Sequence, residues 1–131
     1  MIVTEFIILL EGVTLLTPNA RHRMMWAGKN GKFVIGSITK AQRRLGGAAV
    51  RAGKGPWLPS AEAHRDIFFT LVRGKRQHIL DADAIPSAVK PFLDGIVDSG
   101  VLRDDSPKWC SPHYLPQQRA ETAELRVRIE E

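Results

Sequence analysis

Residues 65–100 read RDIFFTLVRGKRQHILDADAIPSAVKPFLDGIVDSG and contain both kinds of element on which the fold class depends. The segment at about 65–72 is rich in aromatic and β-branched residues, which fit a pleated sheet better than a helix. Between Ile85 and Val97, apolar residues recur at helical spacing, which predicts a helix over 86–99 that stops at Gly100. Pro91 is expected either to kink this helix or to delay its start to Ser87.

Two further strands are predicted at the ends of the chain. Residues 2–16 are rich in β-branched residues and lack a helical polar stripe, which indicates a first strand through the core. Residues 121–130 alternate apolar and charged types, which is typical of an edge strand with one face in water. Together with the strand at about 65–72, these segments predict a mixed sheet.

The region between the first two strands is expected to contain one more helix. Ser37 is a suitable cap for a helix over 38–52, although Gly46 and Gly47 weaken its interior by ~1 kcal/mol per glycine. Residues 19–32 have the composition of an irregular basic loop, and residues 53–60 that of a Gly/Pro turn. The sequence therefore predicts a single α+β domain over 1–131, with a mixed sheet and two helices packed on it.

Composition and length agree with one domain in a reducing compartment. At 131 residues, with 44% hydrophobic types, the chain is long enough for one core. Glu5 and Glu11 interrupt the apolar start and no Lys or Arg precedes it, so neither a signal peptide nor a membrane span is predicted. The single cysteine, Cys110, rules out an internal disulfide and a cysteine-based zinc site. We expect a cytoplasmic protein.

The charge is distributed unevenly along the chain. Residues 1–80 carry 13 Lys and Arg against 4 Asp and Glu, whereas residues 81–131 carry 6 against 10. Basic surfaces attract phosphates through Coulomb steering and counterion release. A polyanionic partner such as nucleic acid is one interpretation of the basic half, and ordinary solvated charge is the other.

Two acidic pairs flank the helix predicted at 86–99. On an extended backbone Asp81 and Asp83 would point the same way, and Asp104 and Asp105 follow the helix. If the helix folds back on the strand, the pairs converge near Lys90, whose charge can stabilise a phosphoryl transition state. Carboxylate oxygens suit Mg²⁺, although most such pairs are turn-forming or solvated residues. The four histidines are scattered without the spacing of a zinc site.

The order of these residues resembles the signature of the RusA family of Holliday-junction resolvases. Asp81-x-Asp83, Lys90-Pro91-x-x-Asp94-Gly95 and Asp104-Asp105 match its Asp-x-Asp start, helical Lys, following Asp and Gly, and closing Asp-Asp. The segment from Pro18 to Arg21, with Trp26, is similar to the Asn- and Arg-containing loop of phage-type members. Two features depart from the family. Ala84 stands where it usually has Asn, and the Asp83–Lys90 interval is about three residues longer than in the shortest members.

The resemblance implies a homodimeric, Mg²⁺-dependent endodeoxyribonuclease, with Mn²⁺ a possible substitute, acting on four-way junctions in DNA recombination and repair in a bacterial or phage-infected cell. It implies metal-binding carboxylates at Asp81, Asp83 and Asp105, with Asp104 as an additional candidate and Lys90 as an assisting cation. The candidate DNA-binding residues, from the basic segments, are Asn19, Arg21, Arg23, Trp26, Lys29, Lys75, Arg76 and His78. A branched-DNA-binding protein that does not cut, and a Mg²⁺-dependent phosphatase on small nucleotides, are the alternatives.

Overall fold

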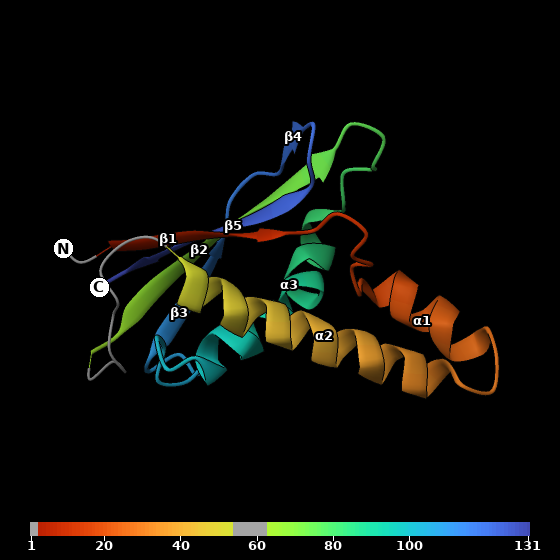
Figure 1. Cartoon of the computed structure of the whole chain (residues 1–131), viewed down its shortest axis with the longest axis horizontal. Coiled ribbons are helices and arrows are strands. Elements are labelled where there is room, and N and C mark those ends of the chain that lie inside the picture. Colours follow the sequence, from red (N-terminus) through yellow and green to blue (C-terminus); the bar gives the residue numbers. More distant parts are fainter. Residues whose placement is uncertain (1–2, 54–62) are drawn as a thin grey trace.

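The computed structural model describes residues 3–53 and 63–131 (Figure 1). The fold is α+β, with a mixed sheet and three α-helices where the sequence predicts two. The elements are β1 (Val3–Leu9), α1 (Pro18–Trp26), α2 (Gly31–Ala52), β2 (Arg65–Gly74), the 3₁₀ helix η1 (Ala82–Ala84), α3 (Ile85–Asp98), β3 (Cys110–Tyr114), β4 (Gln118–Ala120) and β5 (Glu124–Glu130). Most of the Gly/Pro segment predicted at 53–60 lies outside the described residues.

The strand order across the sheet is β1-β5-β2-β3, and β4 pairs with the far end of β2. β5 runs antiparallel to both β1 and β2, whereas β3 and β4 run parallel to β2, so the sheet is mixed as predicted. The prediction that the last strand lies at an edge is wrong, because the chain returns between β1 and β2. Its predicted wet face is confirmed, because Leu125, Val127 and Ile129 are buried while Arg126 and Arg128 are exposed.

One face of the sheet and α3 enclose the core, and α2 covers the same side (Figure 1). Helix α3 contributes Val89, Phe92 and Ile96, so its apolar stripe is core, as its spacing predicts. Pro91 lies inside α3, yet the helix runs on to Asp98. Gly100, with φ of +89°, follows it in the left-handed conformation that glycine adopts most easily. The helix predicted at 86–99 is confirmed.

The basic segment after β1 is helical, which corrects the prediction of an irregular loop over 19–32. Thr17 begins α1 as its N-cap, because its Oγ1 accepts a hydrogen bond from the Ala20 N–H at 3.1 Å and Pro18 occupies the first helical position. After a short turn, α2 begins at Gly31 and not at Ser37. Strand β1 ends at Leu9, earlier than the predicted residue 16.

Strands β3 and β4 have no counterpart in the elements expected from the sequence. Both are short, and β3 contains Pro112. They pair in parallel with β2, and the paired residues lie more than 40 positions apart along the chain. Among the described helices, none combines the length and the apolar character that crossing a bilayer requires.

Candidate functional site

Lys90 is the residue that connects α3 to the second acidic pair. Its Nζ forms an ion pair with the Asp105 carboxylate and lies 3.0 Å from Asp94 Oδ1, one turn further along α3. The loop after α3 therefore folds back against the helix. This brings together Lys90 and Asp105, which lie 15 positions apart in the sequence.

The charges in this cluster stabilise one another. The hydrogen bond with Asp105 raises the pKa of Lys90 despite partial burial, and the same bond lowers the pKa of Asp105. Asp104 accepts a hydrogen bond from the Asp105 N–H at 2.8 Å through its own carboxylate, so it orders the backbone that carries Asp105. All of these side chains remain partly exposed to solvent, which leaves them accessible to a ligand.

Asp81 and Asp83 lie just before α3, both exposed. The backbone of Asp81 is extended, but residues 82–84 form the 3₁₀ helix η1, and the Ala84 N–H bonds to the Asp81 carbonyl at 3.0 Å. The expectation that the two side chains share one side of an extended strand is therefore wrong. The local Ala-Asp-Ala sequence continues directly into α3, so a helical turn replaces the strand.

Gln117 holds the segment in front of Asp81. Its side-chain amide accepts from the Leu80 N–H at 2.9 Å and donates to the Leu80 carbonyl at 2.7 Å. The connection between β3 and β4 thus fixes the backbone next to the first acidic pair. Sequence reasoning missed Gln117, because its partner lies 37 positions away and no local pattern signals the contact.

The donor atoms suit a hard cation, but their arrangement is only part of a site. Asp94 and Asp105 converge on the Lys90 ammonium, which shows that a positive charge is stabilised there. Within residues 3–53 and 63–131, however, no three His, Cys, Asp or Glu side chains are grouped so as to hold a metal ion. Asp81 and Asp83 share no ion pair or hydrogen bond with the Lys90 cluster in this part of the chain. These carboxylates have the oxygen donors that Mg²⁺ prefers, but within the described residues they do not form a closed carboxylate cage.

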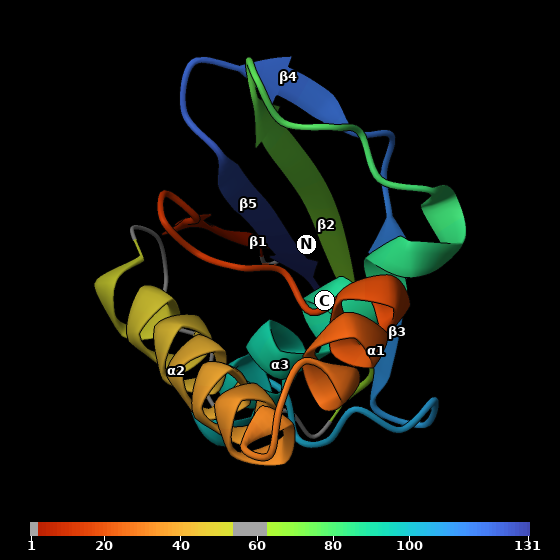
Figure 2. The ribbon, with the colours of Figure 1, turned by 90° about the vertical axis from the view of Figure 1, so that its right-hand side faces the viewer.

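The basic segment after β1 lies beside the start of α3. The Leu16 carbonyl accepts hydrogen bonds from Arg21 Nε and from Ser87 Oγ, both at 3.3 Å. Figure 2 shows α1 next to the first turns of α3. Helix α1 carries four of the candidate DNA-binding residues: Asn19, Arg21, Arg23 and Trp26. Lys29 follows in the turn to α2.

The second basic run is in a different place. Lys75 and Arg76 lie in the turn after β2, where they line a cavity of about 500 Å³ together with Glu11 and Glu121. Lys75 Nζ is 2.5 Å from Glu121 Oε1, so its charge is partly engaged. His78 follows in the same loop, and its carbonyl accepts from Arg73 Nε at 2.8 Å. The structure separates these residues from α1.

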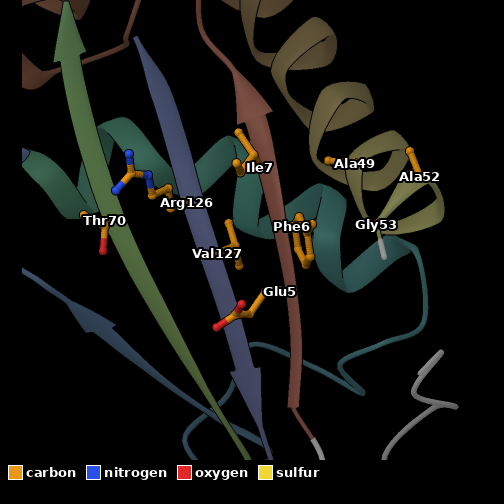
Figure 3. Close-up of a pocket in the computed structure, with 9 residues that line it drawn as sticks. All are labelled: Glu5, Phe6, Ile7, Ala49, Ala52, Gly53, Thr70, Arg126 and Val127. Atoms are coloured by element: carbon orange, nitrogen blue, oxygen red, sulfur yellow. The ribbon is translucent and has the colours of Figure 1, made fainter. Parts of the chain in front are cut away.

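A second cavity, of about 520 Å³, lies at the β1 edge of the sheet near the C-terminal end of α2 (Figure 3). None of the candidate site residues lines it. Its wall is formed by residues of β1, β2 and β5 and by small residues at the end of α2 and just after it: Glu5, Phe6, Ile7, Ala49, Ala52, Gly53, Thr70, Arg126 and Val127. This cavity at the sheet edge is therefore separate from the candidate site residues.

Comparisons with known proteins return no relatives. No protein-family model matches the chain, and neither the curated proteins nor the solved structures contain a significant match.

Proposed function

We propose that this protein is a Mg²⁺-dependent endonuclease that cuts branched DNA, as the resemblance to the RusA family implies. The observation that carries the proposal is the ion pair between Lys90 and Asp105, which joins two parts of the acidic motif across α3. The position of the basic helix α1 beside the start of α3 adds support, because DNA held by α1 would pass close to the carboxylates.

The chain's own residues supply binding and charge. Asp105, together with Asp81 and Asp83, would hold the metal, and Asp104 orders Asp105. A bound Mg²⁺ would supply an activated water and stabilise the leaving oxygen, and Mn²⁺ is a possible substitute. Lys90 contributes a positive charge beside the scissile phosphate. The proposed location is the cytoplasm of a bacterial or phage-infected cell.

A homodimer is part of this proposal, because a four-way junction has near two-fold symmetry and paired sites can cut opposing strands. The free edge of β1 supports it. Within the described residues β1 has β5 as its strand neighbour, and Ile7 and Leu9 on this strand are exposed. Such an edge can pair with a second copy of itself.

A second candidate is a protein that binds branched DNA without cutting it. Two observations favour it: Ala84 replaces the usual Asn, and no three acidic side chains converge within the described ranges. Both candidates predict binding to junctions. They differ only in strand cleavage and in the need for a metal.

The test uses Asp83→Asn with a synthetic four-way junction and a linear duplex, each with Mg²⁺ or with EDTA. The amide keeps the shape of the side chain but removes its charge, so junction binding should persist while cleavage falls by at least a hundredfold. Glu11→Gln is the matched control, because Glu11 is an exposed carboxylate without an ion pair in the described structure. Cleavage by Asp83→Asn at the wild-type rate would refute the site, and binding without any cleavage by the wild type would favour the second candidate.

A further inference from the structure

Two aromatic side chains stand exposed at the far end of the helical pair formed by α1 and α2. Trp26, the last residue of α1, is 80% exposed, and Phe33, in the first turn of α2, is 77% exposed. Met25 and Val34 beside them are also exposed. Figure 1 shows this end of the pair projecting away from the sheet. We call residues 18–44 the arm, and Trp26 with Phe33 its tip.

The arm carries positive charge without any negative charge. No Asp or Glu occurs between Glu11 and Glu62, whereas the arm contains seven Lys and Arg residues. Arg43 is engaged by Asp98, and Arg21 Nε bonds to the Leu16 carbonyl. Within the described chain, the remaining cations of the arm form no ion pair: Arg23, Lys29, Lys32, Lys40 and Arg44.

The arm is built as a defined hairpin of helices. Gly31 packs so closely against α1 that a Cβ there would lie 2.2 Å from the Met24 carbonyl oxygen, and only glycine allows this approach. The Ala27 N–H bonds back to the Met24 carbonyl at 3.4 Å and ends α1. The His22 ring lies 6.1 Å from the Trp26 ring, tilted against it. The backbones on either side of the tip are thus packed closely together.

We propose that the arm recognises the branch of a DNA junction, with Trp26 and Phe33 stacking on bases that become exposed where the strands separate. This inference rests on the proposed action on DNA. A continuous duplex hides the faces of its bases, whereas a branch point offers them, so aromatic stacking favours branched over linear DNA. The flanking cations bind the phosphates on either side without regard to sequence.

Charge and the capacity for stacking together favour this partner over the other possible occupants of an exposed apolar tip. A second copy of the arm would bring together two surfaces that each carry cations and no anion, so self-association through the arm is opposed. An anionic lipid surface shares the negative charge but offers no aromatic rings for stacking. The Leu16 carbonyl connects the root of the arm to the first turn of α3.

The experiment measures the affinity of full-length protein for a four-way junction, a linear duplex and a single strand, in EDTA so that nothing is cut. Trp26→Ala combined with Phe33→Ala should weaken junction binding by about tenfold or more, on the scale of base–aromatic stacking. The affinity for the duplex should change by less than twofold, and so should the slope of log affinity against log salt on the duplex. Leu115→Ala is the matched control, since Leu115 is 42% exposed and lies just after β3, outside both the arm and the β1 edge.

Lys29→Ala combined with Lys32→Ala should behave differently. Both junction and duplex affinity should fall, and the slope of log affinity against log salt should flatten by about 0.9 for each phosphate of duplex DNA that the variant no longer binds. Melting curves should not change for either double variant, because all four side chains are exposed.

Unchanged junction affinity of the aromatic double variant, or an equal decrease on junction and duplex, would overturn the inference. The inference would also be overturned if anionic vesicles at physiological salt bound the wild type but not the double variant, while both proteins bound DNA with equal affinity. The nuclease proposal fails separately: a wild type that discriminates junctions through the arm but never cuts them with Mg²⁺ refutes only that proposal. A wild type that cuts while the double variant binds normally refutes only the arm.

Discussion

Cys110 shows how the fold controls the chemistry of a single residue. It is the only cysteine of the chain and lies at the start of β3, 1% exposed. Burial raises the pKa of the Cys110 thiol to about 11, and the carboxylates of Asp105 and Asp66 act in the same direction. Since the thiolate is the reactive form, the native protein should be inert toward thiol reagents.

We predict that a disulfide reagent at pH 8 labels native Cys110 at least a hundredfold more slowly than the urea-unfolded chain. The pKa shift has a sign for stability as well. The folded state keeps the Cys110 proton to higher pH than the unfolded state. The contribution of the protonated thiol to folding stability is therefore complete below the ordinary pKa of 9.0 and is lost as the pH rises toward 11. Fast labelling of the native protein, at the rate of the unfolded chain, would show that β3 is not packed as described.

At the scale of elements, the crossing of α2 and α3 depends on glycine. A Cβ at Gly95 would lie 1.8 Å from the Arg43 carbonyl oxygen, and one at Gly46 would lie 2.3 Å from the Phe92 carbonyl oxygen. The two backbones are therefore nearly in contact. This explains why α2 tolerates glycine in its interior, where glycine alone costs about 1 kcal/mol.

We predict that Gly95→Ala lowers the free energy of unfolding by about 3 kcal/mol, because the methyl group must push two helix backbones apart. Gly36→Ala in α2 is the control, since no atom lies within 4 Å of the place that a Cβ would take there, and it should be neutral or stabilise by up to about 1 kcal/mol. Urea unfolding of both variants measures the difference. Equal effects at the two positions would rule out the close crossing.

An ion pair also joins these helices. The carboxylate of Asp98, at the end of α3, binds the Arg43 guanidinium, with one contact at 2.8 Å. The bond lowers the pKa of Asp98 and raises that of Arg43.

At the scale of the whole molecule, β1 leaves one edge of the sheet open within the described residues. The Leu10 N–H bonds to the Ala123 carbonyl, so by the alternation of an antiparallel ladder Glu5, Ile7 and Leu9 direct their backbone groups toward the free edge. Ile7 is 52% exposed on this strand. Only one charged side chain of β1, Glu5, protects the edge against pairing.

If the proposed homodimer forms through this edge, Ile7→Lys should convert it to a monomer, because the substitution places two like charges where apolar side chains would meet. Light scattering after gel filtration measures the mass. Ile79→Lys is the control, since Ile79 has similar exposure but lies in the loop before η1. A dimer that survives Ile7→Lys must use another surface, and a wild-type monomer would contradict the dimer itself.

Local patterns in the chain were enough for the class of the fold and for two of its central elements. The strand near 65–72 follows from its aromatic and β-branched composition, and the helix over 86–99 follows from helical spacing. Both signals depend on residues a few positions apart. The approach of Lys90 to the Asp104-Asp105 pair could also be anticipated, because Lys90 lies in α3 and the pair follows its end, so only a short return of the chain is needed.

Contacts between distant residues decided the rest. The central position of β5, the pairing of β3 and β4 with β2 and the hydrogen bonds of Gln117 to Leu80 join segments tens of positions apart, and no local pattern encodes such pairings. The helical arm was missed although Thr17 and Pro18 are start signals, because the basic and glycine-rich composition outweighed them. Among the described residues, Asp81 and Asp83 form no ion pair or hydrogen bond with the Lys90 cluster, and a helical turn replaces the expected strand at Asp83. Carboxylates carry the chemistry of a metal site in their residue type, but their convergence is a property of the folded backbone alone.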